Sequence, residues 1–194
     1  MDAPGLGGRL PLQPPASLGP DARALYARLV EGRLGRAAPF TSQTDGGELI
    51  GPFNALLYAP AIGGGFIGFH EAEEHATPLS KRVREIVILS VGAVWASPYE
   101  TYAHRAVASQ VGFSPDVVAA LAAGDSCDQL GDDERAAQRF TLELAWERVV
   151  GDATYAKAEQ AFGREGLVAL TLLAAAYTAT CTMLKAFAVP APSG

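Results

Sequence analysis

Residues 81–104 read KRVREIVILSVGAVWASPYETYAH, and this stretch decides the fold that the sequence predicts. The residues that follow Glu85 are apolar on every face of a helix, so that helix must be buried nearly all round. Ser80 is suited to cap its start, and Ser97 with Pro98 is suited to begin a second helix. We therefore expect two consecutive helices at the centre of the protein, the first of them almost completely buried.

The segments on either side of this stretch also carry helical patterns. Apolar residues recur at spacings of three and four, whereas alternating β-branched runs joined by tight turns are scarce. The sequence thus predicts an all-α fold, with one domain over residues 21–190 and a flexible arm rich in Pro and Gly over residues 1–20. The expected helices begin, in chain order, near Asp21, Pro52, Pro60, Ser80, Ser97, Ser114, Asp132 and Asp152.

Composition and charge narrow the class of protein. The 194 residues carry a formal net charge of -6, which argues against a surface built to bind nucleic-acid phosphates or anionic lipid. The two cysteines, Cys127 and Cys181, lie far apart and match neither a disulfide framework nor a zinc knuckle, so a reducing cytoplasm is the expected location. These features favour a soluble protein that binds a small molecule.

One segment, Leu167–Leu184, carries no charged residue and reaches the lower length limit of a membrane-spanning helix. Ala and Thr make up much of it, so its insertion into a bilayer would gain little free energy. A helix that is apolar on all sides also suits the centre of a core or a contact between subunits. We expect burial within protein and no membrane contact.

Three ionisable residues in the opening stretch are candidates for chemistry. Glu100 and His104 are four residues apart on one expected helix, which places both side chains on the same face. A carboxylate beside an imidazole orients the ring and suits it to proton transfer near neutral pH. Glu85 begins a buried run, so it needs an imidazole, an arginine such as Arg82 or Arg84, or a partner on a neighbouring helix, unless it is itself protonated. A solvated pair on the helix and a simple ion pair to arginine, neither with a chemical function, are the structural alternatives.

Two other patterns resemble known sites without matching them. Gly63–Gly65 suggests a phosphate-binding loop, but no strand precedes it and no Gly-Lys-Ser or Gly-Lys-Thr follows, so close backbone packing is the simpler interpretation. His70 and His75 are five residues apart in HEAEEH, whereas the zinc-protease motif needs a spacing of four. We expect no bound metal and no cofactor.

The order of the residues in and after the opening stretch resembles a known family. Glu85, Ser97, Glu100, His104 and Gly112 follow one another as in the carboxymuconolactone decarboxylase and alkylhydroperoxidase D-like family, which the sequence resembles over most of its length. The segments that carry the resemblance are GPFNALLYAP, RVREIVILSVGAV, YETYAHRAVASQVGFSPDVVAAL and LVALTLLAAAYTATCTMLKAFAVP. The resemblance implies an all-α fold and a homo-oligomer, a ring-like trimer or hexamer.

The resemblance also separates two kinds of chemistry. In the peroxidase branch of the family, the positions of Ser97 and Glu100 hold two redox cysteines, which this chain lacks there, so thiol peroxidase chemistry through that motif is not available. The chain instead resembles the branch that decarboxylates 4-carboxymuconolactone in aromatic catabolism. Lys185 departs from that branch, where a small polar amide is expected, and leaves the substrate open.

The resemblance implies that Glu85, Glu100 and His104 converge as a catalytic group. In this hypothesis His104 donates a proton, Glu100 orients the imidazole, and Glu85 holds the opposite side or moves a second proton. We expect a lyase that acts on a carboxylated lactone or related cyclic acid. The alternatives are an isomerase, dehydratase or hydrolase of a similar ring, or an oligomeric binding protein without catalysis. The residues expected to bind the carboxylated substrate are Ser97, Arg82, Arg84 and Tyr102.

Overall fold

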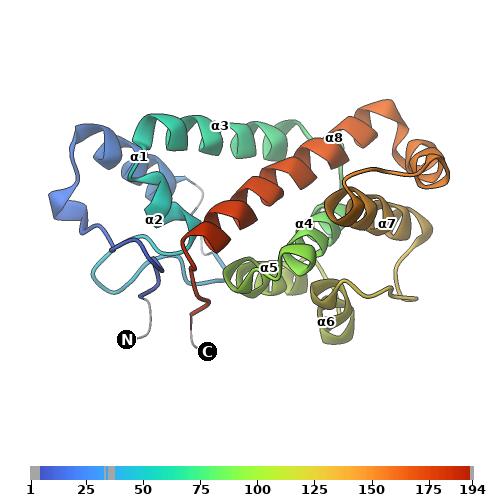
Figure 1. Cartoon of the computed structure of the whole chain (residues 1–194), viewed down its shortest axis with the longest axis horizontal. Helices are drawn as coiled ribbons and strands as arrows, with labels where there is room; N and C mark the ends of the chain where they lie inside the picture. The colour runs from blue at the N-terminus through green and yellow to red at the C-terminus, as the bar shows by residue number, and fades with distance from the viewer. Residues whose placement is uncertain (1–4, 33, 35–37, 193–194) are drawn as a thin grey trace.

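The computed structural model describes residues 5–32, 34 and 38–192, and in this part of the chain the fold is helical (Figure 1). The helices are α1 (Pro20–Glu31), α2 (Pro52–Leu56), α3 (Pro60–Ala76), α4 (Lys81–Trp95), α5 (Pro98–Gln110), α6 (Pro115–Ala123), α7 (Asp132–Glu147) and α8 (Asp152–Ala186), with a short 3-10 helix at Pro15–Ser17. Among the described residues, β-type pairing is limited to one isolated bridge between Gln43 and Leu49. The expected all-α class is confirmed.

The helix starts follow the capping residues in the sequence. The side chain of Ser80 accepts a hydrogen bond from the Val83 amide at the start of α4, as expected of a cap. At α7 the cap differs by one residue from the expected Asp132. Gly131 is the N-cap there, and the Glu134 carboxylate accepts a hydrogen bond from its amide at 3.1 Å. Glu134 therefore caps a free backbone amide, and the acidic first turn of α7 also interacts favourably with the helix dipole.

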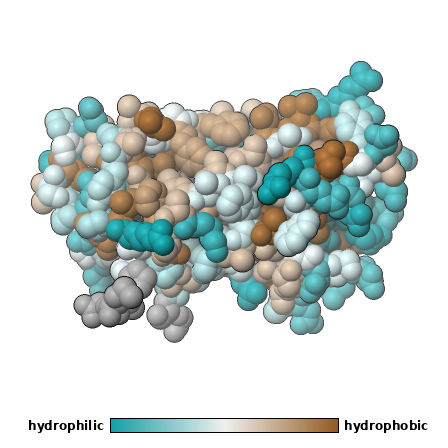
Figure 2. Space-filling model, viewed as in Figure 1, coloured by the Kyte–Doolittle hydropathy of each residue, from teal (hydrophilic) through white to brown (hydrophobic). Residues whose placement is uncertain are grey.

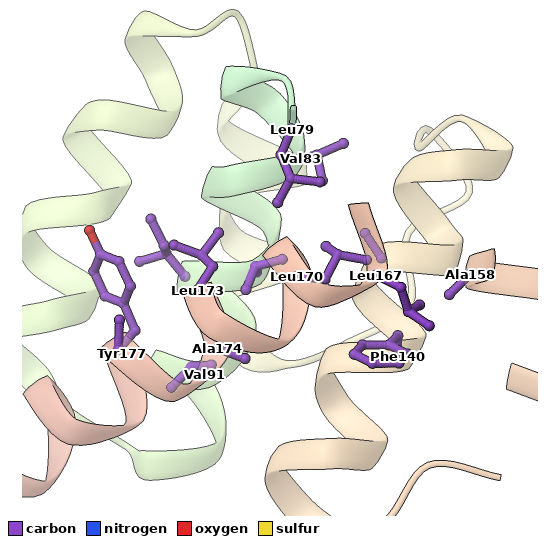
Figure 3. Close-up of a cluster of buried hydrophobic side chains, with 14 of the residues drawn as sticks. Leu79, Val83, Val91, Phe140, Ala158, Leu167, Leu170, Leu173, Ala174 and Tyr177 are labelled. Carbon is purple, nitrogen blue, oxygen red and sulfur yellow. The ribbon is translucent and has the colours of Figure 1, made fainter. Parts of the chain in front are cut away.

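The buried helix that the opening stretch predicts is the centre of the molecule. α4 packs against α5, α6, α7 and α8, and Ile86 and Val87 are fully buried in it. Figure 3 shows Leu170 and Leu173 of α8 in the same apolar cluster as Val83 of α4. Burial of one such side chain stabilises the fold by about 1.5–3 kcal/mol. This cluster between α4, α7 and α8 is the apolar core on which the other helices are placed.

α8 contains the apolar segment that the sequence places within protein. Its backbone leaves the helical region at Gly163 (φ 63°, ψ -179°), which divides it into two helical stretches. By length and composition alone α8 could cross a membrane, but half of its most apolar window is buried inside this chain. Packing against α4 and α7 accounts for the apolar character of the buried half.

Residues 5–19, which belong to the segment expected to be a flexible arm, lie against the body of the protein. The amide of Arg9 donates a hydrogen bond to the Phe187 carbonyl at 2.7 Å. The side-chain amide of Asn54, in α2, donates to the Pro11 carbonyl at 3.1 Å. These contacts attach the arm to α2 and to the end of α8. The first four residues of the chain lie outside the described part.

Two glycines with positive φ allow a test of how closely the backbone at Gly51 packs against Tyr99 at the start of α5. A Cβ added at Gly51 (φ 67°) would lie 2.2 Å from the buried ring of Tyr99, whereas one added at Gly163 (φ 63°) would meet no other part of the protein within 4 Å. We expect Gly163→Ala to lower the free energy of unfolding by about 1–3 kcal/mol through backbone strain alone. Gly51→Ala should lower it by more, because the rigid ring must also move. Urea unfolding measures both, and equal losses would contradict the close contact with Tyr99.

Candidate functional site

A cavity of about 800 Å³ is lined by residues of α2, α3, α4, α5 and α8. Aromatic and aliphatic side chains such as Phe66, Ile88 and Tyr177 share its wall with ionisable groups. Small-molecule sites in proteins have this size and this mixture of apolar wall with a few polar groups. The cavity is therefore the candidate site of this protein.

Glu85, Glu100 and His104 meet in the wall of this cavity. Nδ1 of His104 is hydrogen-bonded to Oε2 of Glu85 at 2.8 Å, and Nε2 of His104 makes an ion-pair contact with Oε1 of Glu100 at 3.2 Å. None of the three side chains exposes more than 12% of its surface. The structure thus brings together the three residues that the sequence singles out. Glu85 pairs with this imidazole and not with a neighbouring arginine.

Two neighbouring helices produce this arrangement. Glu100 and His104 lie one turn apart on α5, and Glu85 projects from the buried part of α4. Glu100 also lies in the first turn of α5, where the helix dipole favours a negative charge. The positive end of α5 and the shared imidazole together offset part of the cost of burying two carboxylates.

The geometry changes the role expected for the imidazole. A carboxylate lies at each ring nitrogen of His104, which favours the doubly protonated imidazolium ion. Because both nitrogens are occupied in this way, His104 is placed to pass protons between Glu85 and Glu100. A ligand in the cavity meets a linked group of three proton-holding side chains, here called the Glu-His-Glu group, instead of a single imidazole.

The two arginines expected to bind substrate lie in different places. Arg84 lines the cavity, where it forms a largely buried ion pair with Glu73. Arg82 instead donates a hydrogen bond from Nε to Glu134 at 2.7 Å, and its guanidinium carbon lies 3.8 Å from the centroid of the Phe113 ring. The hydrogen bond from Arg82 holds the pKa of the Glu134 carboxyl below its usual range. Arg82 therefore joins α4 to α7, and Arg84 is the one of the two that lines the cavity.

Ser97 and Tyr102, the other residues expected to bind substrate, have different neighbours. Ser97 is buried immediately before α5. The hydroxyl of Tyr102 accepts a hydrogen bond from the Thr41 amide at 3.1 Å, which attaches α5 to the loop before α2. Neither residue belongs to the described residues that line the cavity. Both support α5, the helix that carries two members of the Glu-His-Glu group.

The surroundings of Cys181 and the arrangement of possible metal ligands limit the chemistry of the described residues. Burial raises the pKa of the Cys181 thiol far above its usual range, and the neighbouring Glu100 carboxylate raises it further. A thiol held protonated in this way is a poor nucleophile. Among the described residues, no group of three or more His, Cys, Asp or Glu side chains has an arrangement suited to hold a metal ion.

The sequence did not indicate three further residues of the cavity. His70 of α3 is buried, with its ring centroid 5.2 Å from that of Tyr177, and Tyr177 lies 5.1 Å from the ring of His104. Nε2 of His70 lies 3.4 Å from the hydroxyl oxygen of Thr180, on α8. The spacing in HEAEEH indicated only that a zinc-protease motif is absent. The available signal was the position of His70 one helical turn after Phe66, on the same face of α3.

No protein-family model and no curated protein matches the chain. Solved structures do. A peroxidase-related protein with the alkylhydroperoxidase AhpD core, from Ralstonia eutropha, has a TM-score of 0.77 and 19% identity, and the match covers 96% of this chain and 93% of that one. A peroxidase-related protein from Silicibacter sp. has a TM-score of 0.76 and 17% identity, with 100% and 96% covered. The debrominase Bmp8 in complex with 2,3,4-tribromopyrrole has a TM-score of 0.71 and 12% identity, with 97% and 92% covered. At these identities the likeness is one of fold, and the chain has the AhpD-like fold.

The stability of the Glu-His-Glu group can be tested by removing its centre. His104→Ala leaves Glu85 and Glu100 buried without their imidazole, and we expect a loss of about 3–5 kcal/mol in the free energy of unfolding at neutral pH. Arg164→Ala is the matched control, because Arg164 is 91% exposed in its ion pair with Glu159 and its removal should cost less than about 1 kcal/mol. Urea unfolding compares the two. A loss for His104→Ala as small as that of the control would show that the carboxylates do not depend on the imidazole.

Proposed function

We propose that the protein is a cofactor-free acid/base enzyme that acts on a carboxylated lactone or related small cyclic acid, as 4-carboxymuconolactone decarboxylase does. The observation that supports this proposal is the Glu-His-Glu group in the wall of a cavity that apolar, aromatic and further ionisable side chains line together. Burying ionisable side chains costs stability, and such groups are typical of sites where protons are transferred.

The proposed reaction needs one proton and a place for negative charge. The bond between the ring and the leaving carboxylate breaks, carbon dioxide departs, and the electron pair enters the conjugated lactone to give a dienolate-like species. A proton from the Glu-His-Glu group then forms a C–H bond at another ring carbon, and water restores that proton. Because carboxylates occupy both nitrogens of His104, the imidazolium first passes a proton to Glu85 or Glu100, and that carboxyl then hands it to the ring. Water finally returns a proton to His104.

Arg84 is the proposed anchor for a carboxylate that the substrate keeps. Its guanidinium has five N–H donors, more than the Glu73 carboxylate accepts in a bidentate pair, so a second anion can be held beside it. An arginine bound to the leaving carboxylate would stabilise that anion and oppose the loss of carbon dioxide. The anchor therefore suits a ring acid with two carboxylates, one retained and one lost.

The likeness to Bmp8 supports a small ring as the ligand. That debrominase has the same fold and was solved with 2,3,4-tribromopyrrole, a small substituted ring. We propose a ligand of similar size for the cavity of this chain, with carboxylates as its substituents. Arg84 and Lys81 supply positive charge for such an anion in a lining that also holds the carboxylates of Glu71, Glu74, Glu85 and Glu100.

The proposed working form is a cytoplasmic homo-oligomer, a trimer or hexamer. Val168 and Leu172 are exposed and lie one turn apart on α8, and Trp146 of α7 is also exposed. Figure 2 shows apolar side chains gathered over α3 and α8 on the face in view. Apolar residues that gather on one face support a contact with another protein surface.

The first assay is carbon dioxide release from a panel of carboxylated muconolactones, with ultraviolet absorbance to follow the ring. We expect release by the wild type and a rate at least about 100-fold lower for Glu85→Gln, because a proton-transfer group is lost. Glu159→Gln is the matched control and should keep the wild-type rate, because Glu159 is a partly exposed residue of α8 that pairs with Arg164 and does not line the cavity.

The other outcomes separate the alternatives. Ring conversion without carbon dioxide would replace the decarboxylase by an isomerase, dehydratase or hydrolase. If no ring in the panel reacts but the ligands bind, the protein is a binding protein of the same fold. Either result would contradict the proposed reaction.

A further inference from the structure

The lining of the cavity changes in character along the chain. No described lining residue up to Ile67 carries a polar side chain, and all the ionisable lining residues come after it. The first group, here called the apolar end, comes from the loop before α2, from α2 and from the first half of α3, and it includes Phe40, Pro52, Phe53, Leu56, Phe66 and Ile67. Several of these side chains also belong to one buried hydrophobic cluster, so the apolar end continues into the core.

The two groups of lining residues also lie near different ends of α3. This helix starts against α2, and α4 begins shortly after it ends (Figure 1). Phe66 precedes Glu73 by seven residues on α3, a rise of about 10 Å, and Glu73 pairs with Arg84 in the first turn of α4. The positive charges of Arg84 and Lys81 thus lie away from the apolar end. Leu79 makes the lining near α4 mixed, whereas the described lining beside α2 is apolar throughout.

The Glu-His-Glu group lies within the reach of one ligand from the apolar end. The ring centroids of His104 and Tyr177 are 5.1 Å apart, and those of Tyr177 and His70 are 5.2 Å apart. The ring of His70 in turn lies 4.7 Å from that of Phe66. The rings of His104 and Phe66 are therefore separated by no more than about 15 Å. A single molecule in the cavity can contact both the proton-transfer group and the apolar end.

Glu71, the carboxylate nearest to the apolar end along α3, is already paired. It lies one turn after Ile67 and lines the cavity. Nε of Arg28, on α1, donates a hydrogen bond to this carboxylate at 3.3 Å, so a guanidinium offsets its charge. The side chains of the apolar end themselves offer a ligand only carbon atoms. This end of the cavity therefore suits a hydrocarbon group.

The volume of the cavity is larger than a single ring acid needs. At about 800 Å³ it lies in the upper part of the range, roughly 300–1,000 Å³, in which whole drug-sized molecules bind. A lactone ring beside the Glu-His-Glu group, with a carboxylate toward Arg84, leaves the apolar end unfilled. Water there would face side chains that form no hydrogen bonds with it, so an apolar group that replaces this water gains free energy.

We propose that the substrate of this site is amphiphilic, a carboxylated ring that carries an apolar alkyl substituent, and that this substituent fills the apolar end of the cavity. This inference rests on the proposed function, because it places the ring beside the Glu-His-Glu group and its carboxylate near Arg84. It deepens that function by naming the substrate class. Alkyl-substituted ring acids, more than the bare carboxylated lactone, are the ligands that fit the cavity.

The test measures the binding of a series of saturated lactone acids to the wild-type protein by titration calorimetry. The series consists of γ-butyrolactones with a carboxylate on the β carbon and with hydrogen, methyl, propyl or pentyl on the γ carbon. These rings contain no double bond, so the dienolate of the proposed reaction cannot form and binding is measured without turnover. We expect the Kd to fall about fourfold for each methylene that enters the apolar end. A Kd that stays constant along the series, or a series of which no member binds, would overturn the inference.

Phe66→Ala and Phe69→Ala form a matched pair on α3. Phe66 belongs to the apolar end, whereas Phe69 is 37% exposed and is not among the described residues that line the cavity. We expect Phe66→Ala to weaken the binding of the pentyl compound about tenfold, because a contact with an aromatic ring is lost, and to change the binding of the unsubstituted acid little. Phe69→Ala should bind both compounds as the wild type does. Equal losses for the two variants, or a Phe66→Ala variant that loses as much affinity for the unsubstituted acid, would overturn the placement of the substituent.

Failure of the inference and failure of the decarboxylase proposal are distinguishable, because one is read from binding and the other from carbon dioxide. Carbon dioxide release together with a Kd that does not depend on chain length overturns the inference and keeps the proposed reaction. A Kd that falls with chain length, without carbon dioxide release from any ring, supports the inference and contradicts the proposed reaction. The wild-type series depends on no variant, so it decides the inference even where Phe66→Ala does not fold.

Discussion

Two buried carboxylates that share one imidazole set the constraint on which the rest of the structure depends. Glu85 comes from α4 and Glu100 from α5, so His104 fixes how these two helices meet. Taking such ions out of water costs several kcal/mol each, and only the close approach of all three recovers that cost. α4 must therefore be covered by α7 and α8 while its second turn still presents Glu85 to α5. The long apolar α8 provides that cover.

The cavity places this charged group beside apolar side chains. Ile88, Phe66 and Tyr177 contribute apolar wall, and interactions between charges are stronger beside such a wall than in water. Several other ion pairs among the described residues lie at the surface, although Arg84 and Glu73 form a second buried pair. Arg164 and Glu159, for example, meet at the surface, where solvent screens them. The contrast between a buried, shared imidazole and solvated surface pairs is the physical reason to place function in the cavity.

Local patterns in the sequence are sufficient to predict several features of the fold and of the site. The burial of α4, the capping by Ser80 and the shared face of Glu100 and His104 all follow from spacings of a few residues, and the structure has each of them. Contacts between residues that are distant in the sequence could not be predicted in this way. The helical spacing could not show that Arg82 pairs with Glu134, 52 residues away, or that His70 meets Thr180, 110 residues away. Such partners depend on how α3, α7 and α8 are placed around α4, which no short pattern encodes. The partner of Glu85 is an intermediate case, since the need for one was evident but its identity came from the family resemblance.

The protonation state of His104 directly tests whether Glu85 and Glu100 share its imidazole. Nitrogen NMR of protein labelled at its three histidines, with His104 assigned by the loss of its signals in His104→Gln, reports which ring nitrogens carry protons at neutral pH. Because a carboxylate lies at each nitrogen, both should be protonated, and the signals should be those of an imidazolium ion. A His104 with one bare ring nitrogen would contradict the shared-imidazole arrangement and the proton relay built on it.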